Sequence, residues 1–142
     1  MAAEAGLIFK PAILAGLIIG AYEAILVHRD VSVPTHRFGH MVHALVIALV
    51  ATFINFNVPF TLDLFPFLKT VPILGSVLGI RIAVGLIMLI KIHGSSKAIQ
   101  GMHGSQVGMA ETWTHSLLIA ALTIIAPYMW PFLAPVLPAW MS

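Results

Sequence analysis

The chain of 142 residues contains no cysteine. This absence excludes disulfides, thiolate metal sites, haem attached through a CxxCH motif and a cysteine nucleophile. Charged residues are also scarce, at 8% of the sequence, whereas a soluble domain carries roughly a quarter. So little charge cannot cover the surface of a soluble domain. Because the seven Lys and Arg residues form no run, the sequence also lacks the basic footprint of a nucleic-acid-binding protein.

Hydrophobic residues, in contrast, make up 60% of the chain. A membrane-spanning helix uses about 20 residues, so four spans with short connections consume nearly the whole sequence. No room remains for a separate soluble catalytic domain. We therefore expect an all-α integral membrane protein with a single transmembrane domain over residues 1–142.

Apolar segments predict where the four helices lie. We place the spans at residues 7–27, 36–56, 71–92 and 112–130, with a margin of a few residues at each end. Residues 58–70 mix Phe, Pro and charged residues, which favours an interfacial loop or a short re-entrant turn. Beyond Ile125, prolines recur among aromatic residues, so the C-terminal end should kink or unwind and hold an aromatic belt.

Two GxxxG spacings predict close helix packing. Gly16 and Gly20 lie in the first predicted span, and Gly75 and Gly79 lie in the third. Residues four apart share one face of a helix, and glycine there lets another backbone approach closely. We expect all four glycines at helix contacts.

The orientation in the membrane is predicted from Lys and Arg. The first and third connections hold more of them than the opposite side does. The residues on the two sides are Arg29, Arg37, Lys91 and Lys97 against Lys10 and Lys69. The positive-inside rule then places these two connections in the cytoplasm and both termini outside. We expect a multi-pass protein of a prokaryotic plasma membrane.

All seven histidines fall on one side of the membrane if four helices cross in alternation. They are His28, His36, His40, His43, His93, His103 and His115. Glu23, Asp30 and Glu111 belong to the same side. The sequence therefore predicts a polar slab near one membrane surface, with His43 deepest, about two turns into the second helix.

This slab has two interpretations. His36, His40 and His43 follow i, i+4, i+7 spacing, and Glu111 and His115 repeat the i, i+4 relation, so two helix faces could share a metal ion. Imidazole and carboxylate suit Zn, Cu or Fe, and haem is an alternative cofactor. However, histidine also suits a headgroup interface, and no specific motif such as HExxH occurs. The sequence favours an interfacial polar layer over a metal site.

Glu23 and Arg81 are ionisable residues within predicted spans. An ionised side chain inside hydrocarbon costs at least about 2.5–3.5 kcal/mol on insertion scales, so both need partners. Glu23 could turn outward, pair with Arg81 or meet the histidine slab. For Arg81, we expect an ion pair within the chain or with a neighbouring subunit.

We expect a small structural or accessory subunit of a larger membrane complex, such as an oxidoreductase, rather than an enzyme by itself. The absent soluble domain, the GxxxG spacings and the lack of a complete catalytic motif support this interpretation. Its partners would be the lipid bilayer and other membrane subunits or copies of itself, and no nucleic acid. One alternative is a redox subunit whose histidines bind metal or haem. A homo-oligomeric channel or transporter is less favoured, because few polar residues repeat along any helix face.

Overall fold

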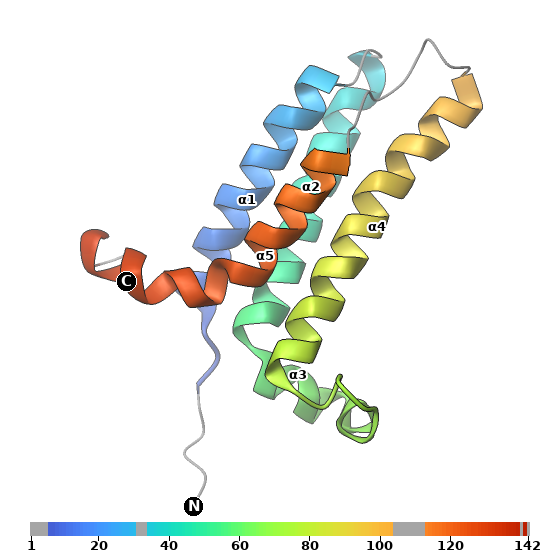
Figure 1. Ribbon diagram of the computed structural model, residues 1–142. Helices are drawn as coiled ribbons and strands as arrows, with labels where there is room; N and C mark the ends of the chain where they lie inside the picture. The colour runs from blue at the N-terminus through green and yellow to red at the C-terminus, as the bar shows by residue number, and fades with distance from the viewer. Residues whose placement is uncertain (1–5, 31–33, 104–112, 140, 142) are drawn as a thin grey trace, which may run out of the picture.

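The computed structural model describes residues 6–30, 34–103, 113–139 and 141. Within these residues the structure has five α-helices, two short 3-10 helices and no strand (Figure 1). In chain order they are α1 (Phe9–Asp30), α2 (Pro34–Phe56), α3 (Val58–Leu64), η1 (Pro66–Thr70), α4 (Val77–His103), α5 (Trp113–Leu133) and η2 (Ala134–Val136). The all-helical class predicted from the sequence is confirmed for this part of the chain.

Four of the helices are long and apolar enough to cross a bilayer. Their apolar segments are Phe9–Leu26, Phe38–Phe56, Val77–Gly94 and Trp113–Val136. No more than 33% of any of these segments is buried inside the chain, so each presents a broad apolar surface that is compatible with lipid. Four such helices are typical of a multi-pass membrane protein.

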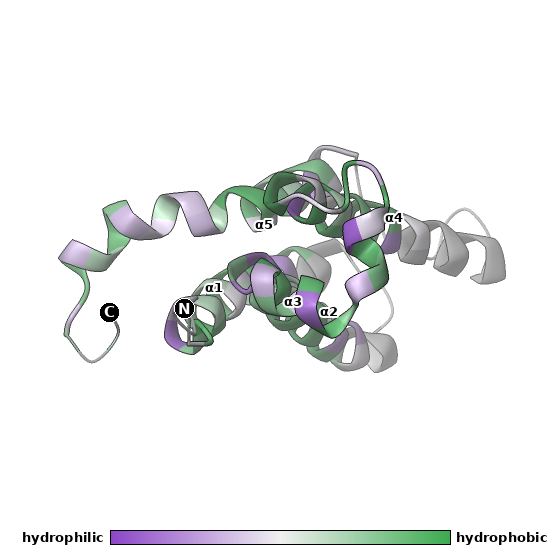
Figure 2. Ribbon diagram, turned by 90° about the horizontal axis from the view of Figure 1, so that it is seen from below, coloured by the Kyte–Doolittle hydropathy of each residue, from purple (hydrophilic) through white to green (hydrophobic). Residues whose placement is uncertain are grey.

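The long helices form two antiparallel pairs. The most extensive contact is between α1 and α2, and the next is between α4 and α5. Figure 2 shows the two pairs as two layers, with apolar residues along the long helices. Helix α2 also contacts α4 and α5, and α1 contacts α5, whereas α1 and α4 do not touch within the described residues. The core is built from small and unbranched side chains as well as isoleucines, namely Ile19, Ala48, Ala51, Met88 and Ile119.

The third long helix begins later than predicted. Helix α4 starts at Val77 rather than near Val71, because Ser76 caps it: the Ser76 Oγ accepts a hydrogen bond from the Gly79 N–H at 3.0 Å. Ile73, just before the cap, has a φ of 74°, a left-handed conformation that is unusual for a β-branched residue. The preceding segment, expected to be a loop or re-entrant turn, contains α3 and η1, and at seven and five residues these are too short to span.

The N-terminal segment is fastened to the end of α2. The Asn57 side chain accepts a hydrogen bond from the Ile8 N–H at 2.7 Å and donates one to the Ile8 carbonyl at 3.1 Å. It also donates to the Phe53 carbonyl at 2.9 Å. A single amide therefore joins the chain before α1 to the C-terminal end of α2.

The C-terminal part of α5 leaves the bundle. In Figure 1, α5 descends beside α2 and then turns, and its last part runs away from the other helices into η2. Pro127 and Pro131 lie inside α5, and each removes a backbone donor and crowds the preceding turn. We call residues 129–136 the C-terminal arm. Its Phe132 and Val136 side chains are 74% and 78% exposed.

Candidate functional site

Gly16 and Gly20 lie where α1 approaches α2. A methyl group at Gly16 would stand 2.5 Å from the Thr52 Oγ1 and 2.9 Å from the Leu49 Cα. At Gly20 it would stand 2.8 Å from the Leu45 side chain. The Thr52 hydroxyl lies beside Gly16 and shares its one proton between the Ala48 carbonyl of its own helix, at 2.8 Å, and the Ala12 carbonyl across the interface, at 3.0 Å.

Gly75 and Gly79 are placed differently from the first pair. Gly75 precedes α4, and a methyl group there would stand 2.9 Å from the Lys69 carbonyl oxygen. Gly79 lies in the first turn of α4, and a methyl group there would clash with the Ile73 carbonyl oxygen. Gly75 therefore lies before α4 and Gly79 lies within it. Both glycines leave room for the backbone of the preceding turn, and not for a neighbouring long helix.

Helices α4 and α5 approach each other at Gly85, which no GxxxG spacing marks. A methyl group at Gly85 would clash with the Ile124 side chain and stand 3.4 Å from the Ala120 carbonyl oxygen. Sequence reasoning missed this contact, since a single glycine within an apolar span carries no pattern.

A buried polar cluster joins α2, α4 and α5 near the start of α4. Its first contact is a hydrogen bond of 2.8 Å from the Asn55 Nδ2 to the Thr123 carbonyl. In a regular helix that carbonyl would accept from the N–H of residue 127, but Pro127 has none. The Asn55 amide therefore replaces the missing donor. Asn55 and Thr123 are both completely buried.

Arg81 repeats this chemistry at the end of α2. Its Nε donates a hydrogen bond of 3.1 Å to the Asn55 carbonyl. Because α2 ends at Phe56, this carbonyl is one of the terminal carbonyls that have no donor within the helix, and residue 59, the donor in a continued helix, is a proline. The Arg81 guanidinium also lies over the Tyr128 ring, 4.4 Å from its centroid. Arg81 thus links three helices at the point where two carbonyl groups have no donor within their helices.

The charge of Arg81 has no acidic partner in this cluster. The ion pair nearby in sequence joins Lys69 and Asp63, at 2.7 Å on the exposed surface. Among the described residues no carboxylate pairs with Arg81, whose contacts are the Asn55 carbonyl and the Tyr128 ring. The side-chain Oδ1 of Asn55 is buried and has no hydrogen-bond partner among the described residues.

The structure does not bring Glu23 and Arg81 together. Glu23 lies in the second half of α1, whereas Arg81 lies about one turn into α4. Since the N-terminal end of α1 and that of α4 lie at the same end of the bundle (Figure 1), the two side chains belong to opposite ends. Helices α1 and α4 also make no contact within the described residues.

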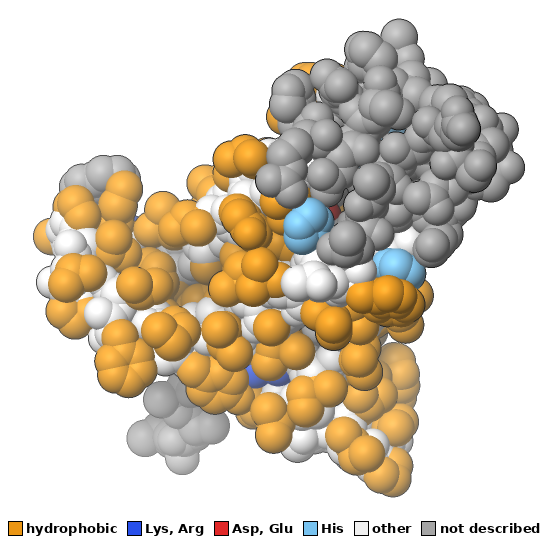
Figure 3. Space-filling view, turned by 45° about the horizontal axis from the view of Figure 1, so that its top comes forward, with side chains coloured by type: hydrophobic (Ala, Val, Ile, Leu, Met, Phe, Trp, Pro, Cys, Tyr) orange, Lys and Arg blue, Asp and Glu red, His pale blue; other side chains and the backbone are white. Residues whose placement is uncertain are grey.

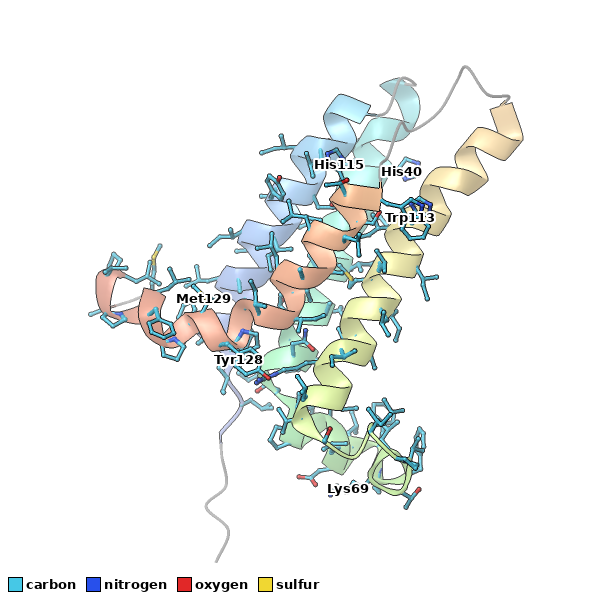
Figure 4. All side chains as sticks on the ribbon, viewed as in Figure 1. His40, Lys69, Trp113, His115, Tyr128 and Met129 are labelled. Carbon is cyan, nitrogen blue, oxygen red and sulfur yellow. The ribbon has the colours of Figure 1, made fainter. Side chains whose placement is uncertain are left out.

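Histidines gather at the other end of the bundle. Figure 4 shows His40 of α2 and His115 of α5 at this end, beside Trp113, and Figure 3 shows histidine side chains at one end of a largely apolar face. His40, His93 and His115 are half-buried, and Glu23 and Ser116 are buried. We call these five residues the polar end. Each of the four long helices contributes to it.

The predicted metal site finds no support in this arrangement. His43, expected to be the deepest ligand, is exposed. Glu111 and the side chains of His36, His28 and His103 lie outside the described residues. Within the part of the chain that is described, no three His, Asp or Glu side chains lie close enough to share a metal ion.

A stacked pair links α4 to α5 at the polar end. The His93 and Trp113 rings are 3.6 Å apart at their centroids and inclined by 21°. Aromatic pairs contribute about 0.5–1.5 kcal/mol beyond their buried area. We expect His93→Ala and Trp113→Ala to show a coupling free energy in this range when unfolding in mixed detergent micelles is measured as a double-mutant cycle. Strictly additive losses would show that the stacking contributes nothing.

The chain matches no protein-family model, and no curated protein or solved structure matches it. The fold alone defines its class, a helical protein with the form of a multi-pass membrane protein. Because fold does not specify function, the function must be inferred from the polar cluster around Arg81 and from the polar end.

Proposed function

We propose that this chain is an accessory subunit of a larger membrane protein complex, in which Arg81 pairs with an acidic side chain of a neighbouring subunit. The observation that carries the proposal is an intramembrane guanidinium with no carboxylate beside it among the described residues. A charged side chain costs about 2.5–3.5 kcal/mol at the centre of a span and less near its end, and Arg81 lies about one turn inside the apolar segment Val77–Gly94. The hydrogen bond to the Asn55 carbonyl and the contact with the Tyr128 ring stabilise the charge, but neither is an acidic partner.

The remaining donors of Arg81 fit a carboxylate. A guanidinium has five N–H groups in a fixed fork, and the Nε–H is engaged with the Asn55 carbonyl. The terminal N–H groups have the geometry that binds a carboxylate through two parallel hydrogen bonds. Because the Asn55 carbonyl and the Tyr128 ring fix the guanidinium, it is preorganised for such a partner.

The C-terminal arm gives the proposal independent support. Beyond Trp130, whose ring packs against Phe56 of α2, it extends away from the bundle, and its Met129, Phe132 and Val136 are 45%, 74% and 78% exposed. An apolar arm that starts beside Tyr128 offers a neighbouring helix a surface next to Arg81. The proposed complex is an oxidoreductase or similar assembly in a prokaryotic plasma membrane, with both termini outside. A redox subunit that binds metal through the polar end is less favoured, because three ligands do not converge among the described residues.

Arg81→Gln is expected to release the chain from its complex. The native membrane would be solubilised in mild detergent, and the tagged chain would be purified for quantitative mass spectrometry. Loss of the ion pair should lower recovery of the partner at least tenfold, since a pair buried in an interface contributes about 2–5 kcal/mol when one side is removed. Lys69→Gln, which removes an exposed and already paired lysine, is the matched control. It should leave recovery unchanged.

A photo-crosslinking residue at Met129 would locate the contact. The cross-linked segment of the partner should contain an Asp or Glu within a membrane span. Replacing that acid by its amide should reduce recovery as much as Arg81→Gln does. Equal recovery of the same partner by wild type and Arg81→Gln would contradict the proposed role of Arg81.

A further inference from the structure

An apolar groove runs between α2 and α4 on the outer surface of the bundle. Ile54 and Val84 line it toward the start of α4, Ile87 and Met88 line its middle, and its volume is about 210 Å³. Apart from Lys91, its lining residues are aliphatic or Met. Lys91 stands at the end of the groove nearer the polar end.

Lys91 lies near the end of the apolar segment of α4, which is the depth at which a membrane-spanning helix meets the lipid headgroups. The apolar segment of α4 ends at Gly94, and the helix continues to His103. The exposed Lys91 side chain is therefore about one turn inside the end of the segment. At that depth a lysine keeps its stem along apolar surface and turns its ammonium group to the interface.

A second groove provides a contrast. It lies between α1 and α2, has a volume of about 400 Å³, and is lined by Phe9, Ile13, Leu17, Leu49, Val50 and Phe53. Both grooves could hold an acyl chain by shape and polarity. Of the two grooves, the one between α2 and α4 has a cation, Lys91, among its lining residues, and the other has none. A lipid with an acyl chain and a negative headgroup complements both the apolar lining and this cation.

We propose that the groove between α2 and α4 binds one acyl chain of an anionic phospholipid, whose phosphate contacts the Lys91 ammonium. The Lys91 ammonium already has an interaction within the chain. Because it has three N–H donors, it can keep that interaction and also bind a phosphate oxygen. Attraction of one lysine to an anionic lipid corresponds to a preference of about fivefold over a zwitterionic lipid. This inference does not depend on the accessory-subunit proposal, because the groove and Arg81 involve different parts of α4.

Native mass spectrometry of the purified full-length chain would test the inference. Phosphatidylglycerol and phosphatidylcholine with identical acyl chains would be titrated separately. We expect phosphatidylglycerol to bind about fivefold more tightly. Lys91→Gln should bring the two affinities together, whereas Lys91→Arg should keep the preference. Loss of the preference in Lys91→Arg as well would contradict a role for the charge.

Two further arms test the groove itself. Ile87 is 63% exposed and Ile13 is 45% exposed, so tryptophan at either position fills its groove from the outside. Ile87→Trp should abolish the preference for phosphatidylglycerol, and Ile13→Trp should keep it. Glycerol 3-phosphate, which has no acyl chain, should not compete. An unchanged preference in Ile87→Trp, or competition by glycerol 3-phosphate, would overturn the proposal.

Discussion

Replacing Gly16 by leucine is expected to separate α1 from α2 and to lower the free energy of unfolding by about 3 kcal/mol, the upper end of the usual cost of overpacking. Even a methyl group at this position would stand 2.5 Å from the Thr52 Oγ1 and 2.9 Å from the Leu49 Cα. The second of these is backbone, so a rotamer change cannot relieve the contact. The larger side chain would also move the Thr52 hydroxyl away from the Ala12 carbonyl, which lies 3.0 Å from it across the interface.

Unfolding by SDS in mixed micelles would measure this loss. Gly39→Leu is the matched control, because Gly39 lies on α2 and has nothing within 4 Å of a methyl group built on it. The control should unfold with the wild-type chain or slightly later, since leucine has the higher helix propensity. Equal stability of Gly16→Leu and Gly39→Leu would show that the two helices do not meet at Gly16.

Replacing Asn55 by alanine is expected to cost about 1–3 kcal/mol, because it leaves the buried Thr123 carbonyl without a donor. The cause of this dependence is Pro127, which lacks the N–H that would otherwise reach that carbonyl. Pro127→Ala supplies a backbone donor. The loss caused by Asn55→Ala should therefore be smaller when residue 127 is alanine.

A double-mutant cycle separates this effect from simple loss of packing. Pro131→Ala is the matched control: it also restores an N–H within α5, but in a regular helix that N–H faces the carbonyl of residue 127 rather than that of Thr123. Asn55→Ala should be rescued by Pro127→Ala and not by Pro131→Ala. Equal rescue by the two proline variants, or none by either, would contradict the assigned hydrogen bond.

The four long helices were predictable because the length of an apolar segment is enough to identify a candidate span. The start of α4 was not, since only Gly75 and Ser76 separate the apolar residues of 71–74 from those of the helix. There the Ser76 cap and the left-handed Ile73 end the turn. Because α4 begins at Val77, Gly75 lies outside the helix. Gly75 and Gly79 therefore do not share a helix face, although their spacing predicts one.

The polar cluster around Arg81 was only half predictable. Arg81 stands out in sequence as a charge within a span, and each proline shows which carbonyl loses its donor. Which side chain replaces the donor depends on how the helices are rotated about their axes, and a single sequence does not specify that rotation. For this reason the pairing of Asn55 with the Thr123 carbonyl, and of Arg81 with the Asn55 carbonyl, required the structure.

At the polar end the sequence grouped residues by the end of the bundle at which they lie but not by contact. His40, His93 and His115 reach the same end, as alternation of the helices requires. His43 follows the same helical spacing, yet it is exposed, because residues three apart on a helix differ by about 60° in direction. The i, i+4, i+7 pattern therefore did not specify which histidines face the bundle.

The mass and composition of the particle extracted intact from its native membrane would test the central claim most directly. Extraction in mild detergent, followed by native mass spectrometry, measures both in one experiment. If the chain belongs to a larger complex, the particle contains this chain and at least one different polypeptide in a fixed ratio. The Arg81→Gln particle should lack that second polypeptide. A particle that contains this chain alone, as a monomer or as copies of itself, would contradict the central claim.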